Sequence, residues 1–127
     1  MVEIDVSRVL CRLSELLESG CRSVSVGAGD WPLKVLVLQV RDGVVRAYVN
    51  RCPHAGHRLN LRPHRFLTPD GALIICASHG ALFEREGGLC LAGPCAGQAL
   101  TPLPVEIIGE HVLLAAGVDP AAYDLNR

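Results

Sequence analysis

Two short runs of cysteine and histidine near the middle of the chain constrain its fold more than any other feature. The first run is Cys52, Pro53 and His54, and the second begins at Cys76 and ends at His79. Each run supplies one thiol and one imidazole, and the twenty-one residues between His54 and Cys76 place the runs on separate loops. Thiolates and imidazoles are the ligands of zinc and iron–sulfur centres, whereas Mg²⁺ and Ca²⁺ call for oxygen ligands. The spacing therefore predicts a metal site shared by two distant segments.

Length and charge narrow the class of protein. The 127 residues predict a single domain, 1–127, that can bury a modest core. The net charge is −1 and Lys34 is the only lysine, so we expect no nucleic-acid partner. The longest apolar stretches are far shorter than a membrane span, and residues 1–5 lack the basic start of a signal peptide. We therefore expect a cytoplasmic protein without a membrane partner. In that compartment the six cysteines are not expected to form a disulfide framework, and those at metal-ligand spacing are interpreted first as ligands.

Short Val, Ile and Leu runs between turn residues predict a mainly β protein. Asp42 and Gly43 join residues 33–41 to residues 44–50, and Asp-Gly between strand-like segments is a strong hairpin signal. Each cysteine–histidine run follows directly after a strand, the second one after residues 72–75. We expect further short strands at residues 81–83, 89–91, 103–108 and 111–115.

One short helix is expected at residues 12–20. Leu13, Leu16 and Leu17 would share one helical face, and Gly20 would close the helix. In the C-terminal tail, Asp119 and Pro120 indicate a second helix start, and the tail could dock on the body or on a partner.

The two runs and their surroundings resemble the Rieske [2Fe–2S] domain family. The resemblance covers about residues 9–115 and leaves a short tail at 117–127. It implies a Rieske-like fold of small antiparallel sheets, with a cluster-binding subdomain formed by two loops. It also implies one [2Fe–2S] cluster per chain, with Cys52 and Cys76 on one iron and His54 and His79 on the other. The matching segments are residues 52–59, 76–83, 87–88 and 93–94.

Departures from the high-potential members of that family set an expectation for the reduction potential. Those proteins have a Ser after the His-Gly pair and a Tyr two residues further, and here Ala81 and Phe83 stand in these places and donate no hydrogen bond to the cluster. Those proteins also join their two loops by a disulfide, for which residues 55–60 and 77–78 contain no cysteine. Both departures predict the lower-potential, soluble Rieske ferredoxin type.

Other residues near the runs have two readings each. Gly56 and Gly80 are either ordinary turn glycines or positions where backbone N–H groups approach the cluster sulfides. Cys95 is most simply a small buried hydrophobe, but it could also touch the surroundings of the cluster or form a disulfide with Cys90 under oxidation. Cys11 and Cys21 are interpreted as buried hydrophobes. The expected neighbours of the cluster are Gly56, His57, Gly80, Ala81, Phe83, Gly93, Pro94 and Cys95.

The resemblance implies an electron carrier, not an enzyme: a soluble protein that takes one electron from a reductase and passes it to a terminal oxygenase or another oxidoreductase. We expect redox proteins as partners and no small-molecule substrate, since the chain has no nucleotide loop and no 2-His-1-carboxylate iron site. The alternatives are a small subunit of a larger oxidoreductase such as an assimilatory nitrite reductase, a redox or iron sensor, and a structural Cys₂His₂ zinc module. Residues 61–70 lengthen the stretch between the runs and could shape partner choice. A local basic cluster consists of Arg51, Arg58, Arg62 and Arg65. It is most simply a solvated face, but a positive rim there would suit an acidic redox partner.

Overall fold

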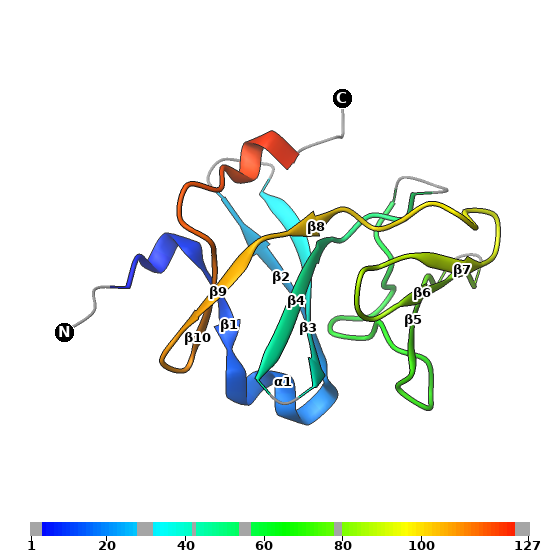
Figure 1. The fold of residues 1–127 in the computed structure, drawn as a ribbon, viewed down its shortest axis with the longest axis horizontal. Coiled ribbons are helices and arrows are strands. Elements are labelled where there is room, and N and C mark those ends of the chain that lie inside the picture. The colour runs from blue at the N-terminus through cyan, green and yellow to red at the C-terminus, as the bar shows by residue number, and fades with distance from the viewer. Residues whose placement is uncertain (1–3, 28–31, 42, 54–56, 78–79, 124–127) are drawn as a thin grey trace.

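The computed structural model describes residues 4–27, 32–41, 43–53, 57–77 and 80–123. It consists of three small antiparallel sheets with little helix, which confirms the predicted fold class (Figure 1). The first sheet has the order β1 (Val9–Arg12), β10 (His111–Leu114), β9 (Val105–Ile108). The second has the order β2 (Cys21–Val26), β3 (Leu33–Arg41), β4 (Val44–Val49), β8 (Pro102–Leu103). The third has the order β5 (Leu73–Ile75), β6 (Leu82–Glu84), β7 (Cys90–Ala92).

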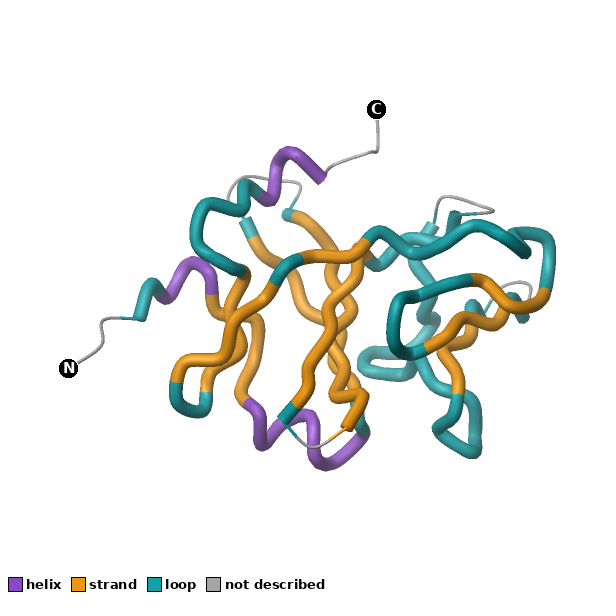
Figure 2. The backbone as a smooth tube through the Cα atoms, viewed as in Figure 1, coloured by secondary structure: helices purple, strands orange, loops and turns teal. Residues whose placement is uncertain are grey.

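The molecule has two halves that lie side by side, one built from both ends of the chain and the other from its middle (Figures 1 and 2). The first two sheets and the chain ends form one half, here called the base (residues 4–49 and 101–123). The third sheet and the long loops around it form the other, here called the ligand-loop half (residues 50–100). Loops make up most of the ligand-loop half, whereas strands dominate the base (Figure 2).

Strand β3 forms a wall between two hydrophobic cores. Side chains of a strand alternate between its two faces. Val35 and Val37 accordingly pack into a core between the two sheets of the base. Leu36 and Leu38 pack into a second core beneath the ligand loops. All four are fully buried, which explains why this part of β3 reads as a continuous apolar run rather than an alternating one.

Helix α1 (Leu13–Ser19) lies where the sequence predicted a helix, and Gly20 closes it as expected. Gly20 has a φ of 80°, and its N–H donates to the Leu16 carbonyl at 2.9 Å. Leu13, Leu16 and Leu17 lie within about 100° of one another around the helix axis, on one face as predicted. Leu16 is fully buried and Leu13 packs against the base core, whereas Leu17 is 71% exposed, so the base covers only part of this face.

Most predicted strands are present with small shifts, and the hairpin of β3 and β4 is confirmed. The predicted strand 103–108 is divided at Pro104 into β8 and β9, because proline supplies no N–H to a sheet and the chain changes sheets there. Strands β1 and β2 were not predicted. In β2 the alternation of Cys21, Ser23 and Ser25 with larger residues is too weak to mark a strand, and pairing with β3 supplies the missing stability.

The C-terminal tail docks on the base. A 3₁₀ helix (Pro120–Tyr123) begins at the predicted position, with Asp119 accepting a hydrogen bond from the Ala121 N–H at 3.0 Å. Val118 and Tyr123 pack against the base core. A second 3₁₀ helix (Val6–Arg8) precedes β1. Among the described residues, no helix has the length and apolar character needed to cross a bilayer.

Candidate metal centre

Cys52, the first residue of the first cysteine–histidine run, follows shortly after the end of β4. The Cys52 N–H donates to the His57 carbonyl at 2.8 Å, and this bond joins the two ends of the segment 52–57, here called the first ligand turn. The buried Asn50 side chain holds the far end of this segment, because its Oδ1 accepts from the Leu59 N–H at 2.9 Å. Its Nδ2 donates to the Asn60 Oδ1 at 2.8 Å. Two buried asparagines, Asn50 and Asn60, therefore hold the ends of the first ligand loop.

Cys76 begins a segment of the same length, residues 76–81, here called the second ligand turn, whose two ends are also joined by a hydrogen bond. The Cys76 N–H donates to the Ala81 carbonyl at 2.9 Å, directly after β5 ends. Gly80 has a φ of 69°, which favours glycine, and its N–H donates to the Cys76 carbonyl at 2.9 Å. Of the two roles considered for Gly80, the structure shows that of a turn glycine, because its N–H is hydrogen-bonded within the turn.

A backbone hydrogen bond joins the two loops. The Ala77 N–H, one residue after Cys76, donates to the Leu59 carbonyl at 2.8 Å. Asn50 in turn binds the N–H of the same Leu59. The link lies between the segments that a disulfide joins in the high-potential relatives of the family described above, and here the connection is made by main-chain atoms.

The structure brings the two predicted cysteine ligands into one buried region. Cys52 and Cys76 are 1% and 0% exposed and belong to the same core. His54, Gly56 and His79 lie outside the described residues, so the structure describes the thiol half of the predicted ligand set. Two buried thiols at matching positions of two joined turns, each turn carrying one histidine in its sequence, fit the mixed thiolate and imidazole ligation of a [2Fe–2S] cluster.

The loop of residues 93–97, here called the covering loop, lies against both ligand loops. Gly93 has a φ of 104°, and a Cβ there would lie 2.9 Å from the Ala81 Cα, so that only glycine fits this approach. Cys95 is buried, and its Sγ lies 2.7 Å from the Cys90 Sγ. Burial, the hydrogen bond with Cys90 and the nearby thiols of Cys90 and Cys52 raise the pKa of Cys95 to about 12. Pro94 is exposed on the surface of the covering loop.

Ala81 and Phe83 are both buried, and neither side chain carries a hydrogen-bond donor. The buried hydroxyl group nearby is that of Tyr48 on β4. It donates to the Arg85 carbonyl at 2.8 Å and accepts from the Gly87 N–H at 2.8 Å. This tyrosine was missed in the sequence, although the Gly87 and Gly88 pair that packs on it was recognised.

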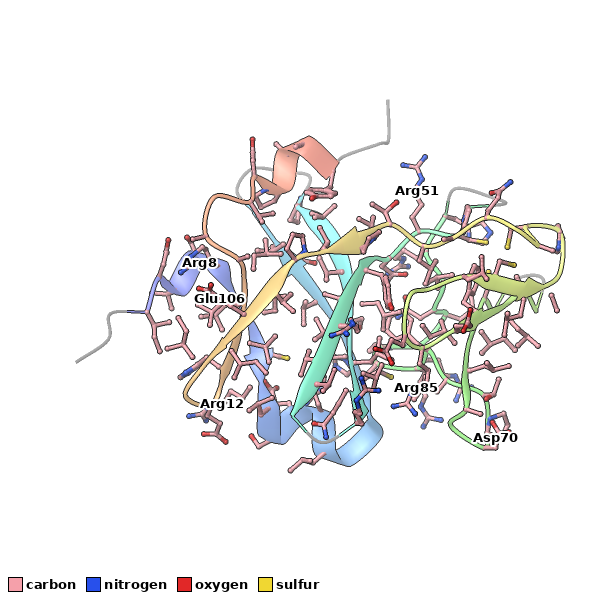
Figure 3. The ribbon with its side chains drawn as sticks, in the orientation of Figure 1. Arg8, Arg12, Arg51, Asp70, Arg85 and Glu106 are labelled. Carbon is pink, nitrogen blue, oxygen red and sulfur yellow. The ribbon has the colours of Figure 1, made fainter. Side chains whose placement is uncertain are left out.

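Charged side chains fasten the third sheet to the base. Arg85 lies between the two halves (Figure 3) and donates to the carbonyls of Gln39 and Gly71. Glu86 pairs with Arg41 at 3.0 Å and with Arg46 at 3.2 Å. These contacts were not predicted, because nothing in the sequence shows that β3, β4 and the turn after β6 adjoin. They join the turn after β6 to strands β3 and β4 of the base.

The stretch between the two loops is ordered by packing and not by regular structure. Phe66 is fully buried, and its carbonyl accepts from the Ile75 N–H at 2.8 Å. His64, at a φ of 61°, accepts at Nδ1 from the Ser23 N–H at 3.0 Å, so its role is to pin this stretch to β2. Residues 61–70 are therefore part of the packed body.

The four arginines of the predicted positive rim reach the surface of the ligand-loop half. Arg51 is half-buried and points outward (Figure 3), while Arg58, Arg62 and Arg65 are exposed. Within the described part of the chain, none of the four forms an ion pair. The exposed His57 lies beside this rim and contacts the Arg58 carbonyl through Nδ1 at 2.8 Å.

An open pocket of about 330 Å³ adjoins the rim. Its lining adds Lys34 from β3 to the cationic side chains of this surface, together with Arg58 and the 79% exposed Leu61. The surface next to the first ligand loop thus combines positive charge with one large apolar side chain.

Comparison with known proteins identifies the sequence pattern. The family described as "Rieske [2Fe-2S] domain" matches residues 7–117. The oxygenase subunit of carnitine monooxygenase from Acinetobacter baumannii is 31% identical over 83 residues, which is 57% of this chain and 20% of that protein. The chain thus spans about a fifth of the length of that curated relative.

Solved structures show the same fold. The ferredoxin of carbazole 1,9a-dioxygenase from Nocardioides aromaticivorans IC177 superposes with a TM-score of 0.65 at 23% identity, over 84% of this chain and 94% of that chain. A complex of reduced oxygenase and oxidized ferredoxin in carbazole 1,9a-dioxygenase contains a chain with a TM-score of 0.63 at 23% identity, matched over 84% of this chain and 90% of that one. The family match confirms the predicted cofactor, one [2Fe–2S] cluster.

Proposed function

Because the chain belongs to the Rieske [2Fe–2S] domain family, we propose that it is an electron carrier that passes one electron from a reductase to a terminal oxygenase or another oxidoreductase. The observation that carries the proposal is that Cys52 and Cys76 lie in one core and that the hydrogen bond from the Ala77 N–H to the Leu59 carbonyl joins the segments next to them.

We propose Cys52, His54, Cys76 and His79 as the four ligands. The cluster, when bound, supplies a one-electron couple whose potential depends on its ligands and on hydrogen bonds to its sulfurs. Ala81 and Phe83 withhold such hydrogen bonds, so this chain keeps the potential in the lower part of the roughly −150 to +300 mV range of Rieske centres.

The proposed partner surface is the positive rim beside the first loop. Arg58, Arg62 and Arg65 are exposed there, and Lys34 extends the positive charge into the adjoining pocket. A partner with an acidic face around its own redox centre would be steered to this surface, and the steering would weaken with salt. The exposed Leu61 offers an apolar contact at the same place.

The ligand assignment is tested by metal analysis and electron paramagnetic resonance of the anaerobically purified, dithionite-reduced protein. We expect iron and sulfide without zinc, and a rhombic signal with the low average g value of mixed Cys/His ligation. The signal should be lost in His54→Ala and in His79→Ala but kept in the matched control His57→Ala, which changes an exposed histidine beside the same loop. Zinc without sulfide, or a signal that survives either ligand substitution, would overturn the assignment.

The carrier role is tested by electron transfer with defined partners. A flavin-dependent ferredoxin reductase and the oxygenase of an aromatic-ring dioxygenase system are mixed with the reduced protein, and cluster absorbance is followed by stopped flow. We expect rapid reduction and reoxidation, slowed several-fold at low salt by Arg58→Glu and much less by the control Arg12→Glu on the far side of the base (Figure 3). A reduced protein that neither partner oxidises or reduces would argue for a sensor instead.

A second candidate is an electron-transferring part of an oxygenase assembly. The observation that favours it is that the 29–31% identical relatives are oxygenase subunits of carnitine and glycine betaine monooxygenases. Stable co-purification with a large catalytic subunit would favour this role over a freely diffusing carrier.

A further inference from the structure

The covering loop contains a pair of thiols that electron transfer by the cluster does not use. Cys90 begins β7, and Cys95 lies five positions later in the covering loop. Their Sγ atoms are 2.7 Å apart, and the residues are 3% and 1% exposed. A disulfide bond is about 2.0 Å long, so the two sulfurs need to approach by under about 1 Å to bond.

The main chain holds the two cysteines in place independently of their sulfurs. The Cys90 N–H donates to the Gln98 carbonyl at 2.8 Å, and the Gly97 N–H donates to the Cys90 carbonyl at 3.3 Å. The Gln98 N–H donates to the Cys95 carbonyl at 2.9 Å. This frame closes the loop on both sides of the pair, so oxidation requires little movement of the backbone.

We propose that Cys90 and Cys95 are a reversible disulfide site, oxidised by a low-molecular-weight disulfide such as glutathione disulfide. One cysteine attacks a sulfur of the oxidant, the oxidant's S–S bond breaks, and one glutathione leaves as a thiol. The second cysteine then attacks the mixed disulfide and releases the second glutathione. Two protein thiols lose two electrons and two protons, and one disulfide is reduced to two glutathione thiols.

The site is accessible through a local opening of the surface loop. The flanking residues 91–94 and 96–99 are all exposed, so that only the two cysteines of this segment face the interior. A short exposed segment opens without disturbing the rest of a fold. The oxidant therefore reaches the pair without unfolding either core.

The state of the pair affects both ligand loops. Gly93 abuts Ala81 of the second turn, and Cys95 lies near Cys52 of the first. A disulfide would limit the excursions of the loop that lies against both turns. This consequence rests on the proposed ligand loops, whereas disulfide formation itself does not.

The test uses the complete protein with its cluster, equilibrated anaerobically in buffers of graded glutathione to glutathione disulfide ratio. After acid quenching, free thiols are labelled with N-ethylmaleimide and the chain is digested with trypsin. Cleavage after Arg85 gives the peptide 86–127, in which Cys90 and Cys95 are the only cysteines. As the buffer becomes oxidising, we expect an unlabelled peptide to replace the doubly labelled one. Its mass should be two hydrogen atoms below that of the unlabelled peptide with two free thiols.

Variants separate this result from general thiol oxidation. Cys11→Ser removes a buried cysteine of the other core and should leave the transition unchanged, while Cys90→Ser and Cys95→Ser should abolish it. Two labels at every ratio, or a peptide linked to another cysteine, would overturn the proposal, and the wild-type mass alone decides this even if a variant fails to fold. The effect on the ligand loops is read as the rate of cluster bleaching in a chelator. We expect it to be several-fold slower for the disulfide form, and equal rates would overturn that link.

Discussion

The base and the ligand-loop half stay folded by different means. In the base, the central strands β2, β3 and β4 have six to nine residues and pair along most of their length, and the core contains mainly Val and Leu. In the ligand-loop half, the strands have three residues each, and the shape depends on individual hydrogen bonds of Asn50, Tyr48 and the two ligand turns. The cysteines follow the same division, since Cys11 alone is in the base core and the other five are in the core beneath the loops. Regular pairing makes a half tolerant of single changes, whereas single hydrogen bonds make it sensitive to them.

The largest expected difference comes from removing one cysteine in each half. Cys76→Ala should remove nearly all iron and sulfide, because it deletes a proposed ligand. Cys11→Ala should keep the cluster and lower the free energy of unfolding by about 1 kcal/mol. Iron and sulfide analysis with denaturant unfolding measures both effects. Equal iron content in the two variants would contradict the assignment of Cys76 as a ligand.

Asn50→Leu should have the next largest effect. It leaves the Leu59 N–H and the Asn60 Oδ1 buried without these partners, at a cost of about 3 kcal/mol in the free energy of unfolding. Asn50→Asp keeps an acceptor for Leu59 and should cost less. Denaturant unfolding and amide hydrogen exchange at Leu59 check the result, and fast exchange in the base instead would contradict it.

The base has its own sensitivity at alkaline pH. Burial, with a smaller effect of Glu15, raises the pKa of the Cys11 thiol to about 11 from its ordinary value of 9.0. Below pH 9 the thiol is neutral in both the folded and the unfolded chain. Between pH 9 and 11 only the unfolded chain loses the proton, so the free energy of unfolding falls by about 2 kcal/mol and then levels off. Cys11→Val should reduce this fall. The free energy of unfolding of both proteins is measured from pH 8 to 11, and a difference between them that stays the same at every pH would refute the prediction.

Tyr48→Phe should give the smallest effect. It tests whether a change at the contact between the two halves stays local. The change removes the hydroxyl between the Arg85 carbonyl and the Gly87 N–H, at a cost of about 1 kcal/mol. Amide exchange of Gly87 should speed up while that of β10 stays constant. A uniform change across both halves would show that they unfold as one unit.

The sequence predicted the base hairpin and the strand ends at the ligand runs because local signals carry that information. The Asp-Gly pair at positions 42 and 43 of the sequence predicted the hairpin of β3 and β4, and Gly20 ends the helix through its positive φ. The split at Pro104 followed from a known property of proline and was still missed, because it needs the knowledge that two sheets meet there. The exposure of Leu17 could not be predicted for the same reason, since burial depends on what covers the helix.

The sequence predicted a set of four ligands but not the residues that support the ligand loops. Cys52 and Cys76 were identified by spacing, and the structure places both in one core. Asn50, Asn60 and Tyr48 were missed, since each acts through a partner at least nine residues away in sequence. The one available signal was that an asparagine stands on each side of the first run, at positions 50 and 60.

The way the chain enters and leaves the ligand-loop half has a consequence for engineering. The Val49 N–H donates to the Thr101 carbonyl at 2.9 Å, and Tyr48 pairs with Pro102. The whole ligand-loop half is thus one uninterrupted insertion whose two ends are neighbours in a sheet. Such a segment can be exchanged as a cassette: loops 50–100 of another member, joined at Val49 and Thr101, would meet the same strand ends and keep the register of β3 and β4. The surface that chooses a redox partner could then be changed while the base is left as it is.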